Sequence, residues 1–520
     1  MDSKEKIKQQ KGFLVMKYVL VLDVGTTNMK VAIVNEKGDI ISQEVKKINL
    51  IQSVEGAAEH DPQELWANFL DISKKIITNF EGDISLLIFS GYQFGFLPID
   101  KKGNPLMNMV TLLDTRSQNI MNEVEERFSF EEIYQKTGCP PAFNYTIARI
   151  LWLKKEKSEI FAKTYKFLDI KSFFTFKLTG KCYTEPSLAS VTQLLDIKTQ
   201  KWDEELIKRL GIDKDQLPDL VPGNVIVDTV KKEIAKEMGL EKEVPIMLGV
   251  YDGGAMILGM GGYKKSAVCN LGTTAMFRSA YNEPLLDKTG QYRLQTYALL
   301  PGMWAIGGAV NNAGVVLEWF RNNIANGMSY DQINEEALKV KAGSEGLICF
   351  PFLTGERDPR IGSLSTGSFF GLKTYHNLSH MARSIYEGVG YGLNMIKTAL
   401  EENDVNLKSL TVGGSGSKSD VWIQILADIF NVPVTKSKTE NATLIGESMV
   451  AFSQLGVYKD IEQAGEVMIK LGKSFEPQTS SVKKYEGYYN FFVKMIQNYR
   501  DMYNLHTQLI NSLGEEEKWQ

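Results

Sequence analysis

The sequence predicts a two-domain α/β protein in which two copies of one strand–turn–strand unit face each other across a cleft. Two observations lead to this prediction. The chain has 520 residues, more than a single hydrophobic core normally accommodates. A Gly-Thr-Thr turn between two strand-like runs occurs near the start, in "YVLVLDVGTTNMKVAIV", and again past the middle, in "VCNLGTTAMF". One copy in each half indicates a duplicated domain.

The composition is that of a globular protein, and it leaves a small, neutral-to-anionic ligand open. The hydrophobic fraction is 43%, and 59 basic against 63 acidic residues give a formal net charge of -4 without long single-sign blocks. Nothing in this charge pattern predicts a nucleic-acid or membrane partner. The four cysteines are far apart and form no Cys-x-x-Cys pair, as expected for reduced thiols in the cytoplasm. A monomer and a homodimer both stay open.

The division of the chain follows from the same features. Residues 1–15 are charged and lack the apolar core of a signal peptide, so they are expected to form a disordered tail. The first domain is predicted over residues 16–257 and the second over residues 258–520.

The first Gly-Thr-Thr turn has the chemistry of a phosphate loop. An apolar, β-branched run ends at Asp23, and Gly25, Thr26 and Thr27 separate it from a second strand that carries Lys30. Glycine lets backbone N–H groups face outward and threonine hydroxyls add donors. Asp23 would hold Mg²⁺ beside the phosphates, directly or through water. Taken alone, the turn could also be an ordinary hairpin, and Lys30 a solvated strand residue.

The second turn repeats the pattern with one difference. Gly272, Thr273 and Thr274 follow a strand in which Asn270 stands where the first copy has Asp23. Only the first loop therefore carries a carboxylate. Two similar domains facing each other would place the two turns on either side of one nucleotide phosphate tail.

Two further segments carry candidate chemistry. In "PIMLGVYDGGA" an apolar run delivers Asp252 into a Gly-rich turn, where its carboxylate can reach a bound ligand; capping the following helix is the alternative. Gly413, Gly414 and Ser415 follow a short strand and precede an amphipathic helix predicted over residues 420–430. Glycines there would let the chain lie flat against a purine ring.

Together these segments resemble the actin-like ATPase superfamily, in which duplicated ribonuclease-H-like domains enclose ATP in an interdomain cleft. Within it the chain is similar to the FGGY carbohydrate kinases from about residue 18 to about residue 489. The resemblance implies ATP- and Mg²⁺-dependent phosphoryl transfer to a sugar hydroxyl, with Asp252 as catalytic base and Asp23 as metal ligand. The nucleotide contacts that it implies are Gly25, Thr26, Thr27, Lys30, Gly272, Thr273, Thr274, Gly314, Gly413, Gly414 and Ser415.

The same resemblance gives the acceptor site. The contacts that it implies are Tyr92, Gln93, Phe94, Asp114, Arg116, Asn144, Asp252 and Gly253. Ketopentose kinases of the family carry Gln-Met-His where this chain has Tyr-Gln-Phe, and Leu112 replaces the Trp of the family's Trp-x-Asp-x-Arg. Residues 137–197 look most like gluconate kinases, whereas Asp358 and Arg360 depart from them. Gluconate is therefore the favoured acceptor, and a ketopentose or another polyol stays open.

Two other classes of function use related folds or cofactors. A non-catalytic sugar-sensing or ATP-hydrolysing switch on the same fold would need no base aimed at a sugar, so the combination of Asp23 and Asp252 argues against it. A Rossmann dehydrogenase is excluded because no Gly-x-Gly-x-x-Gly follows a strand and opens a helix.

Overall fold

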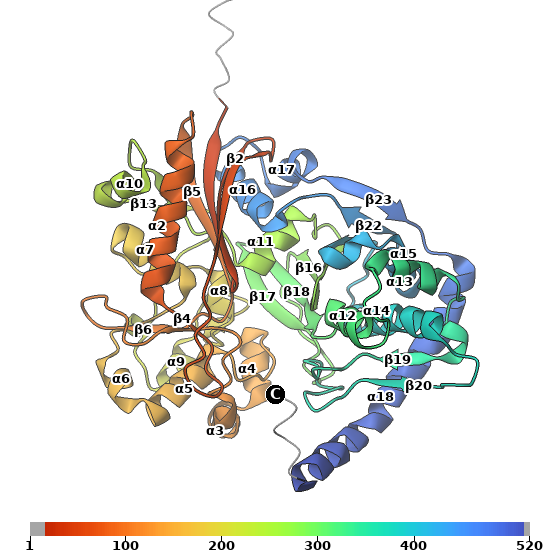
Figure 1. The fold of residues 1–520 in the computed structure, drawn as a ribbon. Helices are drawn as coiled ribbons and strands as arrows, with labels where there is room; N and C mark the ends of the chain where they lie inside the picture. Colours follow the sequence, from red (N-terminus) through yellow and green to blue (C-terminus); the bar gives the residue numbers. More distant parts are fainter. Residues whose placement is uncertain (1–15, 514–520) are drawn as a thin grey trace, which may run out of the picture.

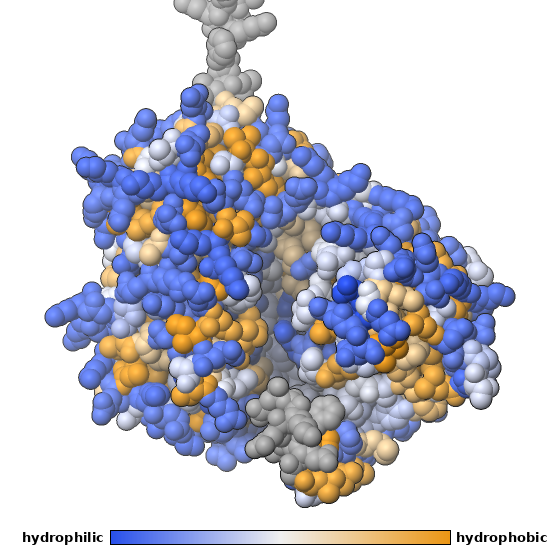
Figure 2. All heavy atoms as spheres, viewed as in Figure 1, coloured by the Kyte–Doolittle hydropathy of each residue, from blue (hydrophilic) through white to orange (hydrophobic). Residues whose placement is uncertain are grey.

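The computed structural model describes residues 16–513, so the predicted tail over residues 1–15 lies outside the described residues. The chain folds into two α/β halves that lie side by side, each built on its own sheet (Figure 1). A groove runs between the halves on the face shown in Figure 2. Along the described residues no helix combines the length and apolar character needed to cross a bilayer.

The first sheet has the strand order β3-β2-β1-β5-β14-β13. Strands β1, β2 and β3 are antiparallel neighbours, β5 and β14 run parallel to β1, and β13 is antiparallel to β14. The bounds are β1 (Tyr18–Val24), β2 (Asn28–Asn35), β3 (Ile40–Lys47), β5 (Ile84–Gly91), β13 (Ile226–Thr229) and β14 (Pro245–Met247).

The second sheet repeats this arrangement. Its order is β18-β16-β15-β21-β22-β23 with the same sequence of strand directions, and β17 adds an extra antiparallel edge. The predicted duplication is therefore confirmed strand by strand. The bounds are β15 (Ser266–Leu271), β16 (Ala275–Tyr281), β17 (Gln295–Leu300), β18 (Met303–Val310), β21 (Ser409–Gly413), β22 (Val434–Ser437) and β23 (Leu471–Phe475).

The central strands are apolar without alternation because both faces of each sheet are covered. In β1 every residue after Tyr18 is buried. Helices α2 (Pro62–Thr78), α7 (Ile170–Thr179) and α10 (Lys232–Met238) belong to the first half. Asp61 caps α2 by accepting from the Gln63 N–H at 2.8 Å, and a proline follows at the first helical position.

The first half carries an insertion between β5 and β13 with a hydrophobic core of its own. Trp152 and Ile150 lie in this separate core of the insertion. Its elements are β6 (Leu97–Ile99), β7 (Met109–Val110), α3 (Met121–Phe128), α4 (Phe130–Thr137), α5 (Thr146–Glu156), α6 (Ser158–Lys163), β8 (Lys166–Leu168), β9 (Tyr183–Thr184), α8 (Pro186–Ser190), β10 (Leu195–Asp196), β11 (Lys201–Trp202), α9 (Glu204–Leu210) and β12 (Asp219–Leu220); β4 (Glu59–His60) precedes β5 and pairs with β7.

Two helices join the halves. Helix α11 (Asp252–Gly259) follows the first sheet, and α16 (Ala442–Gln454), from the second half of the chain, returns to pack on α11, β1 and β5 (Figure 1). The helices approach so closely that a Cβ on Gly446 would lie 1.8 Å from the Ala255 carbonyl oxygen. The domain boundary predicted after residue 257 falls inside α11. Helix α16 lies within residues 258–520, yet its buried residues belong to the hydrophobic core of the first sheet.

The remaining helices surround the second sheet and its small hairpin. They bury one contiguous core, to which the C-terminal helix contributes Tyr485, Phe492, Ile496 and Tyr503. The bounds are α12 (Gly314–Asn323), α13 (Tyr330–Leu338), β19 (Ile348–Phe350), β20 (Ser368–Phe370), α14 (Leu378–Glu401), α15 (Asp420–Phe430) and α18 (Thr479–Leu513). Helix α17 (Ile461–Met468) packs instead on α16 and α11, and its Ala464 and Met468 belong to the core of the first sheet.

Candidate active site

Both Gly-Thr-Thr turns connect the first two strands of their sheets. Gly25, Thr26 and Thr27 join β1 to β2, and the Gly25 N–H donates to the Asn28 carbonyl at 3.0 Å. The second turn joins β15 to β16, with the Gly272 N–H donating to the Thr274 carbonyl at 3.0 Å. Thr27 is exposed, as are both threonines of the second turn. Each turn therefore keeps threonine donors free for a ligand.

The predicted nucleotide glycines of the second half gather around the second turn. The Gly314 N–H, at the start of α12, donates to the Gly272 carbonyl at 2.9 Å, and a Cβ on Gly314 would lie 2.6 Å from that oxygen. Gly414 has φ +82°, and a Cβ there would lie 2.7 Å from the Leu271 carbonyl oxygen. Both positions need glycine because neighbouring backbone leaves no room for a side chain.

A cavity of about 500 Å³ opens beside these glycines, a size typical of small-molecule sites. Thr273, Gly314 and Ser415 line it, so three of the predicted nucleotide contacts share one cavity. Sequence reasoning did not identify the polar and aromatic remainder of its wall. Those additional lining residues include Glu318, Tyr330, Asn334, Tyr386, Lys418 and Trp422.

Asp252 is the first residue of α11, and Tyr251 holds the N-cap position. The Asp252 carboxylate accepts from the Gly253 N–H at 2.8 Å, and the N-cap residue Tyr251 makes no side-chain cap hydrogen bond. Burial and, to a lesser extent, the Asp23 charge raise its pKa, Lys171 opposes the rise, and the resulting pKa is about 7. A carboxyl group with a pKa near 7 can exchange a proton at neutral pH.

Asp23 is the next-to-last residue of β1, beside the first turn, and is 7% exposed. Burial raises its pKa, and Lys30, directly opposite on β2, counteracts that rise with its Nζ 3.7 Å from Asp23 Oδ2. Lys30 Nζ also donates to Asn441 Oδ1 at 3.3 Å, just ahead of α16. Lys30 therefore links the two halves and is more than a solvated strand residue.

The predicted acceptor loop follows β5, next to the first turn. The Tyr92 N–H donates to the Val24 carbonyl at 2.9 Å. The Tyr92 ring itself is buried, and its hydroxyl lies 3.1 Å from His60 Nδ1 and 3.1 Å from Met109 Sδ. Its side chain supports the loop from within the core, and the contact of Tyr92 with an acceptor stays a prediction. Gln93 and Phe94 are partly exposed.

The other acceptor segments converge on this loop. The Arg149 guanidinium donates to the carbonyls of Phe94 and Thr111, and so joins the loop to the segment that carries Asp114 and Arg116. Ser117 Oγ donates to the Phe143 carbonyl at 2.7 Å, which places Asn144 beside the same group. The structure thus brings together three segments that are far apart in the sequence.

Arg116 is already compensated by two carboxylates. Its Nη2 lies 2.7 Å from Asp114 Oδ2 and 2.5 Å from Glu59 Oε1, and its guanidinium stacks over the Trp152 ring at 4.8 Å. Asp114 is 2% exposed and also accepts from the Ala58 N–H at 3.0 Å. The ion cluster carries a net negative charge, with Arg116 as its most exposed member.

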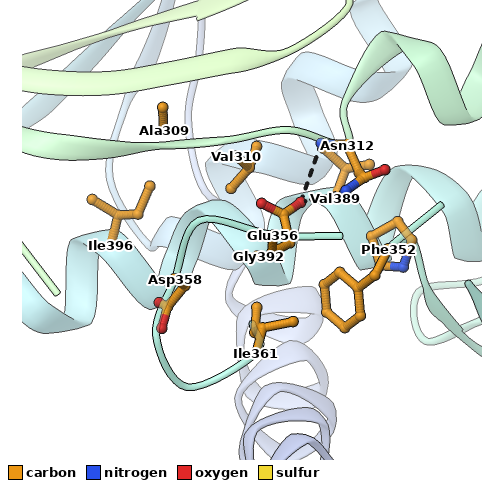
Figure 3. Close-up of a pocket in the computed structure, with 11 residues that line it drawn as sticks. Ala309, Val310, Asn312, Phe352, Glu356, Asp358, Ile361, Val389, Gly392 and Ile396 are labelled. Carbon is orange, nitrogen blue, oxygen red and sulfur yellow. Dashed lines mark hydrogen bonds between the residues drawn. The ribbon is translucent and has the colours of Figure 1, made fainter. Parts of the chain in front are cut away.

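The Gly-Glu-Arg segment supports the nucleotide side. Figure 3 shows Glu356 hydrogen-bonded to Asn312, two residues after β18, and both residues line a cavity of about 10 Å³. Glu356 accepts from the N–H groups of Asn311 and Asn312 at 2.9 and 3.1 Å, and so fixes the turn that leads to Gly314. The cavity has room for about one water molecule, so Asp358, which lines it, does not face a sugar there.

Several functional side chains escaped the sequence analysis. Arg149 and Glu447 each lie within the buried stretch of a helix, and a charged residue inside a mainly apolar run is a usable signal of a buried polar contact. Glu59 offers no comparable signal, because its partner Arg116 is 57 residues away.

This geometry fits one class of protein, a two-domain phosphotransferase: each half carries a Gly-Thr-Thr turn, and Asp252 has a pKa of about 7. The chain belongs to the FGGY family of carbohydrate kinases, whose N-terminal domain model matches residues 18–259 and whose C-terminal domain model matches residues 267–455. It has the family's actin-like, ribonuclease-H-like fold and is an ATP-dependent sugar kinase, not the non-catalytic switch considered above.

Relatives of two specificities are similar to the chain over most of its length. A gluconokinase from Bacillus subtilis is 31% identical, with 95% of this chain and 97% of the relative covered. A xylulose kinase from the same organism is 28% identical, with 94% and 98% covered. Structures of a xylulose kinase and a gluconate kinase from Lactobacillus acidophilus superpose with TM-scores of 0.90 each, at 29% and 28% identity, covering 94% of this chain and 100% of theirs.

Proposed function

We propose that the chain transfers the γ-phosphoryl group of ATP to a hydroxyl of gluconate, with Asp252 as the general base. The observation that carries the proposal is the Asp252 carboxyl group, whose pKa is about 7 at the start of α11. A base with this pKa is largely able to accept a proton at neutral pH and can still release it afterwards.

The reaction balances without further groups. The acceptor hydroxyl oxygen forms a bond to the γ-phosphorus while the bond from that phosphorus to the bridging oxygen of ADP breaks. The hydroxyl proton moves to an Asp252 carboxylate oxygen and is later released to solvent. Gly253 follows Asp252 and has no room for a side chain, because a Cβ there would lie 2.7 Å from the Tyr251 ring, so its proposed contact with the acceptor is through its backbone.

The donors for the phosphates come from both halves. The proposed contacts to the β- and γ-phosphates are Gly25, Thr26, Thr27, Lys30, Gly272, Thr273 and Thr274. Gly314, Gly413, Gly414 and Ser415 are proposed to hold the adenosine, because Gly314 and Ser415 line the 500 Å³ cavity. The exposure of the threonines at both turns supports this assignment.

A divalent cation fits the carboxylate side of the site. We propose Mg²⁺, bound through Asp23, since a buried carboxylate beside a phosphate loop offers the hard oxygen ligand that this ion prefers. When bound, the ion would neutralise phosphate charge during transfer. The raised pKa of Asp23 fits this role, because a nearby cation would compensate the buried negative charge.

A neutral ketopentose such as xylulose is the second candidate acceptor, and one observation favours it. A sugar acid needs a cation for its carboxylate, yet Arg116 is already paired with Asp114 and Glu59. The gluconokinase relatives and the resemblance of residues 137–197 to gluconate kinases favour gluconate. If gluconate is the acceptor, Arg116 would have to exchange Asp114 or Glu59 for the gluconate carboxylate. A neutral ketopentose would require no such exchange.

ADP release with Mg-ATP tests the proposal, using gluconate, xylulose, ribulose, glycerol and no acceptor in parallel. Stimulation by gluconate supports the first candidate, and stimulation by xylulose alone replaces it with the second. Asp252→Asn should lower kcat by about 10²- to 10⁴-fold. Activity near that of the unchanged protein would remove Asp252 from the role of base.

Location and assembly remain predictions. We infer a cytoplasmic location, because the substrate ATP is abundant there and the four cysteines are buried and unpaired. A homodimer is testable by light scattering of the purified protein.

A further inference from the structure

The segment Leu248–Tyr251 delivers Asp252 into the site without belonging to a strand or a helix. Strand β14 ends at Met247 and α11 begins at Asp252. Side chains from three separate helices hold its backbone. The hydrogen bonds are Lys171 Nζ to the Leu248 carbonyl (2.8 Å), the Val250 N–H to Glu447 Oε1 (2.9 Å) and the Tyr251 N–H to Ser187 Oγ (2.8 Å).

Two of these holding groups, Lys171 and Ser187, contact the same buried carboxylate, that of Glu185. Lys171 Nζ lies 3.1 Å from Glu185 Oε1, with both side chains almost fully excluded from solvent. Ser187 Oγ donates to the same carboxylate at 2.7 Å. An ion pair buried this deeply contributes little net stability after desolvation. Its contacts with the segment ahead of Asp252 indicate a role in geometry.

The third holding group comes from the other half of the chain. Glu447 lies on α16 and is fully buried, and within residues 16–513 its Oε2 has no hydrogen-bond partner. Gly249 makes room for it: φ is +63°, and a Cβ there would lie 1.9 Å from Oε2. Burial raises the pKa of Glu447 to about 8, against the effect of Lys171. The neutral carboxyl therefore predominates at pH 7, and Oε1 still accepts from Val250.

We propose that Glu447, Ser187 and the Lys171–Glu185 pair are positioning residues that set the place of Asp252 through the backbone of Leu248–Tyr251. The inference rests on the proposed function, in which Asp252 is the base. None of these groups needs to touch the acceptor or ATP. A displacement of about 1 Å at a reacting group can cost about 100-fold in rate, so the loss of one holding group should appear in kcat.

Steady-state kinetics of Glu447→Ala test this directly. We expect kcat to fall by about 10- to 100-fold while the KM values for acceptor and Mg-ATP stay within about threefold. Glu447→Gln should recover most of the lost kcat, because an amide oxygen can accept from Val250 and the side chain keeps its shape. Ser448→Ala on the same helix is the matched control, since the Ser448 hydroxyl bonds only to the Leu444 carbonyl.

The pH dependence of kcat/KM separates the proposed role of Lys171 from a purely structural one, because a purely structural role would leave it unchanged. Lys171 lowers the pKa of Asp252, whereas burial and Asp23 raise it. Lys171→Met should therefore shift the acid limb of kcat/KM to higher pH. An acid limb that stays in place in a folded Lys171→Met protein contradicts the proposed placement of the pair.

Ser187→Ala keeps the proposal falsifiable if Glu447→Ala fails to fold, because it removes one oxygen atom and the acceptor of the Tyr251 N–H. Unchanged kcat in Ser187→Ala, and in Glu447→Ala where that variant folds, with Asp252→Asn inactive, overturns the positioning role and leaves the base in place. An active Asp252→Asn overturns the base itself, and the positioning role with it.

Discussion

The backbone N–H of Gly314 donates to the carbonyl of Gly272 over 2.9 Å, and so ties the start of α12 to the second Gly-Thr-Thr turn. A methyl group at residue 314 would lie 2.6 Å from that oxygen and push the helix away from the turn. Gly314→Ala should therefore raise the KM for ATP by about tenfold with a smaller change in the KM for the acceptor. Steady-state kinetics with each substrate varied in turn measure both values.

Gly487→Ala is the matched control for that substitution. Gly487 lies within α18, and a Cβ at this position would have no neighbouring atom of the described residues within 4 Å outside its own helix turn. Alanine there should leave both KM values unchanged and stabilise the helix by about 1 kcal/mol. Equal KM values for ATP in the two variants would contradict the proposed contact at residue 314.

The rate should rise with pH through about 7. Asp252 accepts the acceptor proton only when deprotonated, and its pKa is about 7. The acid limb of kcat/KM, measured over about pH 5 to 9, should give this value. An acid limb near the ordinary carboxyl value of 3.8 would mean that burial and Asp23 do not act on the group as described.

Stability should depend on pH in the opposite sense. Because the folded-state pKa of Asp252 exceeds the ordinary value of 3.8, the folded protein binds more protons than the unfolded chain between about pH 4 and 7. The contribution of this group to stability therefore falls as the pH rises through that range. Asp252→Asn should raise Tm more at pH 8 than at pH 5, and an equal shift at both pH values would contradict the linkage.

Arg116→Met should destabilise the protein by about 3 kcal/mol, because Asp114 and Glu59 would be left buried without their cation. Thermal unfolding measures the effect. Lys46→Met is the control: Lys46 forms an exposed pair with Asp71, whose loss should cost less than about 1 kcal/mol. Similar Tm values for the two variants would mean that the cluster around Arg116 is not strongly coupled.

Tyr330→Ala should weaken ATP binding without affecting the acceptor. Tyr330 lines the 500 Å³ cavity and is 47% exposed, with the Arg321 guanidinium 5.5 Å from the ring centroid. Loss of the ring should raise the KM for ATP about fivefold to tenfold. Tyr375→Ala removes an equally exposed ring outside the cavity and should leave the KM unchanged; a rise in both variants would point to a general effect.

The fold was predictable because its signals are local. The Gly-Thr-Thr turns recur between strands, and the helix predicted over residues 420–430 is α15, with the same bounds. The turn and base segments could be identified for a similar reason, since glycine and carboxylate patterns lie within a few residues of each other.

Contacts between distant segments were not predictable in this way. Tyr92 follows the strand expected to present it, but its side chain packs against His60 and Met109. Arg149 reaches backbone carbonyls of two loops, and Glu447 reaches Val250 across 197 residues. No spacing in the sequence encodes these contacts, because they depend on how the helices pack on the sheets.

The return of α16 onto the first sheet has a consequence for biosynthesis. Leu444, Ile445 and Met449 complete a core whose first strand begins at Tyr18. During translation, the emerging N-terminal half therefore has an incomplete core until residues near 454 have left the ribosome, although domains usually fold as units during synthesis. A truncated chain ending after the N-terminal family domain would leave β1 and β5 without one of their covering helices, and we expect it to aggregate.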